Sequence, residues 1–422
     1  MDRHTCTRAT RLLLAGGVIS LSAPASADFI KDSKASLELR NFYFNRDFRQ
    51  DNAAQSKQEE WAQGFLLRYE SGFTDGLIGF GVDAIGLVGV KLDSSPDRAG
   101  SGLLQRHRTT RKGAQDEYGE LGVTAKVRTS KTTLKLGTLL PKLPTVLAND
   151  SRLLPQTFEG GQLTSLEFEG LTVDGGRLKQ VNQRDSSDYE DMSITKTGAK
   201  GIITPQATSN KFDFASLNYK WTGNLATGYS YGHLDNLYSQ HLVHLTYVLP
   251  VTAGQSFKSD LRFARSIHDG GSNVDNKALG AMFTYSLGGH ALGLGYQGMS
   301  GDTGFAYING TDAFLVNFVQ IGDFASKDEK SWQARYDYNF AAMGVPGLTF
   351  MTRYLTGDNI DLGGNRPEGK EWERDTDIGY VVQSGPLKNV GVKWRNATVR
   401  STNFGSDLDE NRLIVSYSLA IW

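Results

Sequence analysis

Apolar and polar residues alternate at every second position through long stretches of this chain. The clearest case is the carboxyl-terminal segment, where one parity holds Leu413, Val415, Tyr417, Leu419 and Ile421. The other parity holds Arg412, Ser416, Ser418 and Ala420. A period of two is typical of a β-strand that presents one apolar face and one polar face. Residues 390–395 repeat the pattern, with Lys393 and Arg395 on the polar side.

Short segments of the same kind recur along the chain, separated by clusters of Gly, Asp, Asn and Ser. The most complete is a hairpin from Leu279 to Tyr296, in which Gly288 and Gly289 supply a two-residue turn. The second face of this hairpin carries mainly Gly, Ala, Thr and Ser. These small residues leave space beside the sheet, whereas a soluble sandwich fills its inner face with bulky side chains.

An apolar face opposed to a small or basic face is the pattern of a transmembrane β-barrel. A lipid-facing Arg or Lys costs roughly 2–4 kcal/mol at the bilayer midplane, so the basic parity is expected to face the interior. We predict an all-β fold, a transmembrane antiparallel β-barrel of about 18 strands over residues 28–422. A barrel of this size leaves an aqueous channel. The alternative is a large soluble all-β scaffold, which would fold without detergent or lipid.

The amino terminus follows a different pattern. A basic start precedes an apolar run, Leu12–Ala23, that is too short to span a bilayer. Ala25-Ser26-Ala27 then forms a small-residue cleavage sequence, so we predict a secretory signal peptide over residues 1–27. The only cysteine, Cys6, lies in this segment, which leaves the mature chain without disulfides. The formal net charge of −1 gives no reason to expect nucleic acid as a partner.

Three connections between the predicted strands are too long to be simple turns. Residues 93–117 carry a basic cluster, and we expect an exposed loop there; its members are Arg106, His107, Arg108, Arg111 and Lys112. Residues 182–210 are polar, with an acidic middle. Residues 139–166 contain Pro141, Pro144 and Pro155, which prevent continued strand pairing, yet the segment is too apolar for a solvated loop. We therefore predict that it folds into the lumen and narrows the pore.

Basic side chains occupy the inward parity of several predicted strands: Arg40, Arg128, Arg335, Arg353, Lys393, Arg395 and Arg412. Arg152 belongs to the inward loop and Arg184 follows a strand-like stretch, whereas parity does not fix the facing of Arg46 and Arg49. Arg offers a bidentate fork to a carboxylate. A row of weak sites suits transport, because a solute must both bind and leave. The other interpretation is that the bases pair with luminal acids and brace the wall, as Arg335 would with Asp337.

The sequence contains no recognisable catalytic constellation. Its seven histidines show no metal-ligand spacing, and no glycine-rich phosphate loop follows a strand. We predict that the protein is not an enzyme and needs neither a metal nor a cofactor. An outer-membrane hydrolase is the weaker alternative, and it would turn over an ester or a peptide.

Several longer motifs stand out along the chain: Asn41–Asp47, Tyr69–Phe73, Gly79–Asp83, Ser151–Thr157, Glu329–Asp337, Pro346–Phe350 and Arg412–Val415. Together they resemble the OprD family of Gram-negative outer-membrane channels. The resemblance covers the whole mature chain. It implies a monomeric 18-stranded barrel in the outer membrane, with inward-folded loops and a ladder of basic residues that guides carboxylates.

Carried over to this chain, the family's ladder falls on Arg46, Arg152, Lys393, Arg395 and Arg412. The lysine at position 393 keeps the charge but lacks the guanidinium fork. We place Asn149, Asp150 and Ser151 at the constriction beside Arg152. The family's acidic residue on the opposite pore wall corresponds to Asp323.

Three further segments, Phe48–Gln50, Pro141–Thr145 and Asn182–Tyr189, resemble the OccK-like branch of the family, which favours cyclic or aromatic carboxylates. That branch adds Arg49 and Arg184 to the ladder. The resemblance implies a porin for passive uptake of benzoate- or vanillate-like acids, surrounded by outer-membrane lipid and lipopolysaccharide. The alternatives are selectivity for basic amino acids or peptides, and a general diffusion pore whose bases only bias ion selectivity.

Overall fold

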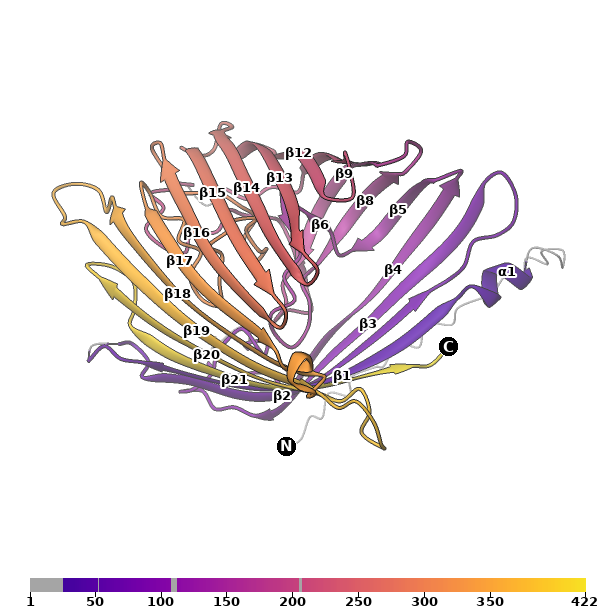
Figure 1. Cartoon of the computed structure of the whole chain (residues 1–422), viewed down its shortest axis with the longest axis horizontal. Coiled ribbons are helices and arrows are strands. Elements are labelled where there is room, and N and C mark those ends of the chain that lie inside the picture. Colours follow the sequence, from indigo (N-terminus) through magenta and orange to yellow (C-terminus); the bar gives the residue numbers. More distant parts are fainter. Residues whose placement is uncertain (1–25, 52, 108–111, 205–206) are drawn as a thin grey trace, which may run out of the picture.

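Long antiparallel strands, each paired with its neighbours in the chain, form a closed barrel in this computed structural model (Figure 1). The structure describes residues 26–51, 53–107, 112–204 and 207–422. In that part of the chain the main sheet has 19 strands, of which β10 is a two-residue addition and the other eighteen form the wall. The prediction of an all-β barrel of about 18 strands is confirmed.

The wall strands are β1 (Lys34–Phe48), β2 (Lys57–Glu70), β3 (Gly79–Asp93), β4 (Glu117–Thr129), β5 (Thr132–Leu139), β8 (Thr157–Ser165), β9 (Leu171–Asn182), β11 (Phe212–Lys220), β12 (Leu225–Leu234), β13 (Tyr238–Thr252), β14 (Gln255–His268), β15 (Asp275–Leu287), β16 (His290–Ser300), β17 (Lys330–Asn339), β18 (Leu348–Ile360), β19 (Gly369–Val381), β20 (Gly391–Thr402) and β21 (Leu408–Ala420). The shorter elements are α1 (Ser26–Lys31), β6 (Lys142–Leu143), β7 (Val146–Leu147), β10 (Tyr189–Glu190) and the 3-10 helix η1 (Phe340–Met343). Strand β1 pairs with β21 from Ser36–Ala420 to Phe48–Leu408, which closes the barrel.

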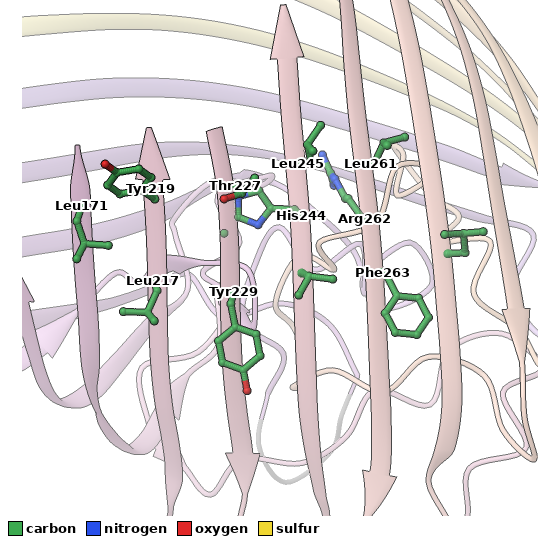
Figure 2. Close-up of a pocket in the computed structure, with 13 residues that line it drawn as sticks. Leu171, Leu217, Tyr219, Thr227, Tyr229, His244, Leu245, Leu261, Arg262 and Phe263 are labelled. Atoms are coloured by element: carbon green, nitrogen blue, oxygen red, sulfur yellow. The ribbon is translucent and has the colours of Figure 1, made fainter. Parts of the chain in front are cut away.

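The predicted alternation places apolar side chains on the outside of the wall. In the β15–β16 hairpin, Leu279, Leu292 and Leu294 are 53%, 57% and 69% exposed. Gly288 turns the chain between the two strands with φ 56°, a left-handed conformation that suits glycine. Figure 2 shows residues of β9 to β15, among them the outward-facing Leu217 and Phe263, that line a groove of about 570 Å³. Most of its lining faces outward, whereas His244 and Arg262, also labelled in Figure 2, lie at inward positions of β13 and β14.

Connections at one end of the barrel are short, and the long ones lie at the other end. The two-residue turns 130–131 and 288–289 are at the first end, whereas connections 94–116, 140–156, 183–210 and 301–329 are at the second. Within the described residues, no helix is long and apolar enough to cross a membrane. The predicted signal peptide, residues 1–27, lies almost wholly outside the described residues, as does Cys6.

The proline-containing segment folds inward, as predicted, but it is shorter than expected. Residues 157–165 form wall strand β8, so the expected loop 139–166 is wrong at its carboxyl end. The loop packs its Leu153 and Leu154 against Phe42 and Phe44 of β1, and all four side chains are almost fully buried. These phenylalanines share the inward parity of Arg40. They obscure the pattern in the sequence because the loop, rather than water, covers them.

The expectation of an exposed loop over residues 93–117 is wrong in part. Leu103 and Leu104 in this connection are fully buried in the same cluster as Leu153. Arg106 folds back and donates a hydrogen bond from Nη2 to the carbonyl of Ala99, at 3.0 Å. His107 and Lys112 are exposed, and Arg108 and Arg111 lie outside the described residues. The apolar pair turns this loop toward the interior.

A fourth long connection, residues 301–329, was not recognised in the sequence. It buries Phe305, Ile308 and Phe324 inside the barrel. Isolated β-bridges join Ile308 to Ile194 and Asp312 to Leu147, which ties this loop to two of the other inward connections. Three loops therefore fill part of the lumen as one packed unit.

Candidate functional site

Cross-strand register arranges basic side chains in rows on the inner wall. Arg46 of β1 lies opposite Glu410 of β21, and Arg395 of β20 lies opposite Arg412. Lys393 is two residues farther along β20. Because alternate residues of a strand are about 7 Å apart, Arg46, Arg395 and Lys393 descend the wall in steps of about that length. Their side chains are 18%, 20% and 48% exposed, so each is accessible from the lumen.

Glu410 lies at the centre of the uppermost of these rows and is fully buried. Its carboxylate accepts from Arg46 Nη2 and from Arg412 Nε, each at 2.5 Å, and from Gln320 Nε2 at 3.1 Å. The guanidinium groups of Arg46 and Arg412 also lie 5.4 and 5.9 Å from the centre of the Phe44 ring, and that of Arg152 lies 5.1 Å from it. Two guanidinium groups thus bind one carboxylate, and a third, that of Arg152, joins them at one aromatic ring.

Arg412 and Arg152 stand behind the luminal surface rather than on it, since they are only 1% and 6% exposed. Arg152 donates from Nε to the carbonyl of Ser101, at 3.2 Å. Burial, together with the neighbouring charges of Arg412 and Arg184, holds the pKa of Arg152 well below its usual range. The position therefore disfavours a positive charge, and the nearby carboxylate of Glu410 offsets this only partly.

The loop that carries Arg152 is fixed to the wall by a second arginine. Arg40 of β1 donates from Nη1 to the carbonyl of Arg152 at 2.8 Å and to Asp150 Oδ1 at 2.7 Å. Arg184, from the next inward connection, donates to Asn149 Oδ1 at 2.9 Å and to Ser151 Oγ at 3.2 Å. The predicted constriction residues Asn149, Asp150 and Ser151 thus form the surface on which Arg40 and Arg184 converge.

Arg184 has a charge environment similar to that of Arg152. Burial lowers its pKa, and the nearby carboxylates Asp185 and Asp312 offset this only partly. Among the described residues, neither Arg152 nor Arg184 forms a salt bridge with a carboxylate. Asp312 is bound to the side-chain amide of Asn149, and burial raises the pKa of this carboxyl. The loop side of the constriction therefore carries an excess of positive charge.

Most of the other predicted bases have acidic partners. Arg335 Nε lies 2.7 Å from Asp337, Arg49 Nε lies 2.7 Å from Asp409, and Arg353 Nη2 lies 2.7 Å from Asp375. Arg395 and Lys393 share Asp377, at 3.0 and 3.2 Å. Arg128 stacks on Phe73, 4.2 Å from the ring centre, beside a short turn. Bracing of the wall thus describes Arg335, Arg353 and Arg49, whereas two bases sharing one acid leave Arg395 and Lys393 with a net positive charge.

Asp323, expected on the opposite pore wall, lies in a buried ion pair. Lys200 Nζ is 2.7 Å from its carboxylate and Tyr307 Oη donates to the same oxygen at 2.8 Å. Asp323 is 9% exposed and Lys200 is 2% exposed. Burial next to this carboxylate raises the pKa of Tyr307 well above its ordinary value. The acid is neutralised by a lysine from the 183–210 connection, which sequence reasoning did not single out.

Sequence reasoning also missed Glu410, Asp377, Gln320 and Phe44. Glu410 could have been found, because it shares the inward parity of Arg412 two residues later. Asp377 requires the register of β19 against β20, where it pairs with Arg395. Gln320 requires the fold of the fourth loop. These partners decide which bases are neutralised and which keep an unbalanced charge.

An apolar exterior, a wall of eighteen strands and basic rows in the lumen together define an outer-membrane β-barrel channel. The chain belongs to the OprD family of outer membrane porins, whose family model matches residues 27–421. The predictions of family, of outer-membrane location and of a channel rather than an enzyme are confirmed.

Known relatives cover nearly the whole chain. The Porin-like protein GalP of Pseudomonas putida is 38% identical over 413 residues, which is 95% of this chain and 96% of that protein. The crystal structure of Pseudomonas aeruginosa OpdQ is 68% identical, covers 94% of this chain and 100% of its own, and superposes with a TM-score of 0.87. The crystal structure of Pseudomonas aeruginosa OpdK with vanillate is 39% identical to this chain. It covers 93% of this chain and 100% of its own chain, with a TM-score of 0.85.

Proposed function

We propose that this porin takes up small carboxylates passively, with a preference for aromatic acids such as benzoate or vanillate. The excess of positive charge at the constriction supports this proposal. Arg46 and Arg412 share one carboxylate, Glu410, and the loop arginines Arg152 and Arg184 have no salt bridge among the described residues. A carboxylate passing this point offsets the cost of holding buried guanidinium groups close together.

The descending bases suit transport rather than tight binding. A fixed cation about 4 Å away attracts a carboxylate by ~1 kcal/mol in bulk-like water and by about 4 kcal/mol at the effective dielectric of a protein surface. Arg46, Arg395 and Lys393 are each partly neutralised by a nearby acid, which keeps their attraction for a passing anion in the lower part of this range. A carboxylate can therefore move from one base to the next without being trapped.

The state of Asp323 argues against a preference for basic amino acids. A cationic solute needs an accessible carboxylate on the pore wall, and Asp323 is buried under Lys200 at 2.7 Å. The vanillate in the OpdK crystal structure shows that a relative 39% identical to this chain accommodates an aromatic acid. Both observations favour the aromatic carboxylate branch.

Uptake by proteoliposomes tests the proposal. Purified protein should admit labelled benzoate faster than labelled arginine. The double variant Arg184→Gln/Arg395→Gln should take up benzoate about tenfold more slowly. Each removed base contributes about 1 kcal/mol or less to the attraction of a carboxylate in a water-filled passage. The matched control is Arg177→Gln, which removes an arginine whose side chain is 54% exposed and paired with Asp213 on the outer face. Faster uptake of arginine than of benzoate would contradict the proposal.

We also propose that the mature channel acts as a monomer in contact with outer-membrane lipid and lipopolysaccharide, after removal of residues 1–27. The pairing of β1 with β21 closes the barrel within one chain, which supports the monomer. Light scattering of the detergent-solubilised protein should give the mass of one chain plus detergent. The intact mass of protein isolated from outer membranes should correspond to a chain that begins at Asp28.

A further inference from the structure

One stretch of the fourth loop has an unusual burial pattern. In residues 312–320, the odd-numbered side chains Ala313, Leu315, Asn317 and Val319 are at least 92% buried. The even-numbered side chains Asp312, Phe314, Val316, Phe318 and Gln320 are only half-buried. Val316 lies over Gly280 of β15 and Phe314 packs against β13 and β14, so these half-buried side chains lie partly against the wall and leave the rest of their surface to the interior of the barrel. The segment thus presents an apolar surface at its middle, between two polar ends.

Both ends of the segment are tied to the basic constriction. Asp312 accepts a hydrogen bond from the amide of Asn149, the residue that also binds Arg184. At the other end, the carbonyl of Gln320 accepts from Arg412 Nη2 at 3.3 Å, and its side-chain amide donates to Glu410 at 3.1 Å. The segment therefore runs across the lumen side of the site from one group of bases to the other.

Polar contacts fix the middle of the segment to the wall. The backbone N–H of Asn317 donates to Gln297 Oε1 at 2.9 Å, and its side chain donates to Ser331 Oγ at 2.8 Å. Gln333 donates to Asn317 Oδ1 at 2.9 Å. Asn317, Gln297 and Ser331 are fully buried, so this anchor is shielded from water. The neighbouring Val316 and Phe318 are thereby held in fixed positions.

The two phenylalanines are supported by rigid neighbours. Phe318 meets the ring of Tyr307 edge to face, with 6.5 Å between ring centres. Phe314 lies under the guanidinium of Arg262, 3.9 Å away, and meets His244 edge to face at 5.5 Å. Arg262 is itself held by Asp260 through two hydrogen bonds of 2.9 Å. Each phenylalanine therefore keeps one part of its ring packed and leaves another part available in the lumen.

We propose that Phe314 and Phe318 are specificity-determining residues that bind the ring of an aromatic carboxylate while the bases hold its charged end. This inference rests on the proposed function and adds the part of the pore that recognises the ring. Phe318 is two residues from Gln320, a span of at most about 7 Å, and Gln320 contacts Glu410, the partner of the accessible Arg46, so the ring lies within reach of a solute held at Arg46. Aromatic pairs prefer edge-to-face or offset contacts, which favours a flat ring over an aliphatic chain. An aliphatic carboxylate makes the charge contacts alone.

Competition experiments in planar bilayers separate ring recognition from charge recognition. The probes are benzoate and acetate, which share a carboxylate and differ by the ring. The readout is the concentration of each that halves the chloride current through a single channel. In the wild-type channel, benzoate should act at a lower concentration than acetate. Phe318→Ala and Phe314→Ala should each reduce this preference by about three- to tenfold. The concentration of acetate that halves the chloride current should stay unchanged.

Three controls make the result specific. Phe283→Ala removes a phenylalanine that is 41% exposed on the outer face, and it should leave the preference unchanged. Phe318→Leu keeps the apolar bulk and loses the ring, so it should retain only part of the preference. Arg184→Gln should weaken the block of the chloride current by benzoate and by acetate to the same extent. Heat-modified migration on gels and the potassium chloride conductance report whether each variant has kept its fold and its pore.

The outcomes distinguish this inference from the function on which it rests. A wild-type preference for benzoate that persists in both phenylalanine variants overturns the ring surface and leaves carboxylate uptake standing. If the phenylalanine variants weaken the block by benzoate and by acetate equally, the ring surface is also overturned, because Phe314 and Phe318 would then act only by packing the loop. A wild-type channel that neither acetate nor benzoate blocks contradicts the proposed function itself.

Discussion

At the scale of single residues, the charge available to a solute depends on one buried acid. Glu410 binds Arg46 and Arg412 directly, and it also lowers the electrostatic cost of keeping the nearby Arg152 positively charged. With this carboxylate in place, the cluster keeps a moderate positive charge. Without it, the same bases would attract anions more strongly and would be less stable. The residue therefore balances selectivity against stability.

Replacement of this acid should change selectivity and stability in opposite senses. In Glu410→Gln, the buried Arg412 loses its ionised partner, and breaking a buried pair costs about 3–5 kcal/mol of unfolding free energy. The chloride-over-potassium permeability ratio should rise, because the same guanidinium groups remain. Urea unfolding in detergent and reversal potentials measure the two effects. Asp213→Asn, on the outer face, is the control, and an unchanged permeability ratio in Glu410→Gln would contradict this account.

Parity in the sequence predicts which way a strand residue points, but it does not predict what that residue meets. It placed Lys393, Arg395 and Arg412 on the inward face, and the structure has them there. The exposure of these bases could not be predicted. Arg412 is buried because Gln320, from a loop about ninety residues away in the chain, covers it. Such contacts depend on tertiary packing that a period of two does not encode.

At the scale of elements, the inward loops convert a wide barrel into a shaped passage. The tip of the 301–329 connection is held by acids of β19, since Glu373 accepts from the backbone N–H groups of Ile321 at 2.9 Å and Gly322 at 2.7 Å. Glu329, at the base of the same loop, accepts from the backbone N–H of Ser326 at 2.9 Å. These contacts hold Gln320 against the basic cluster. The position of the loop therefore sets the geometry of the constriction.

Docking of this loop should depend on pH through Glu329. Burial, together with the charge of Glu371, raises the pKa of the Glu329 carboxyl well above its ordinary value. Its neutral form therefore favours the docked loop, and docking weakens as the pH rises through this raised pKa. Interruptions of single-channel current should become more frequent toward alkaline pH in the wild type, and this dependence should be weaker in Glu329→Gln, which keeps Glu373 against the loop. The same pH profile in both proteins would rule out this role of Glu329.

The sequence predicted only one of the inward loops that form the constriction. Prolines and apolar residues together identified the segment around Arg152, because a strand excludes the former and water disfavours the latter. Connection 301–329 was missed because it lacks such a proline signal, and its apolar residues at 313, 315 and 319 resemble a short strand. The buried Lys200–Asp323 pair joins two connections, so neither sequence segment predicts it alone.

At the scale of the whole molecule, one structural rule accounts for both the fold and the channel. Outward positions carry leucine, phenylalanine and tyrosine, and inward positions carry small or charged residues, so the wall is compatible with lipid on one side and water on the other. This rule is simple enough for the barrel and its strand number to be predicted from sequence. The individual strand ends, as at β8, are less well predicted because they depend on where each loop leaves the wall.

A charge on the outer face should destabilise the barrel far more than the same charge on the inner face. Leu294 is 69% exposed on the outer wall, and Leu294→Arg should cost about 2–4 kcal/mol. Thr284→Arg, on the inward parity of the adjacent strand, should be tolerated because its side chain can extend into water. Unfolding in lipid vesicles measures both. Equal losses of stability would show that Leu294 does not face lipid.

The account depends most on the claim that luminal bases, and not the size of the pore, select carboxylates. The most direct measurement is the reversal potential across a bilayer in a gradient of potassium benzoate, for the wild type and for Arg184→Gln/Arg395→Gln. We predict that the wild type favours benzoate over potassium and that the double variant loses this preference while its conductance stays similar. An unchanged reversal potential in the double variant, or a preference for potassium in the wild type, would contradict the account.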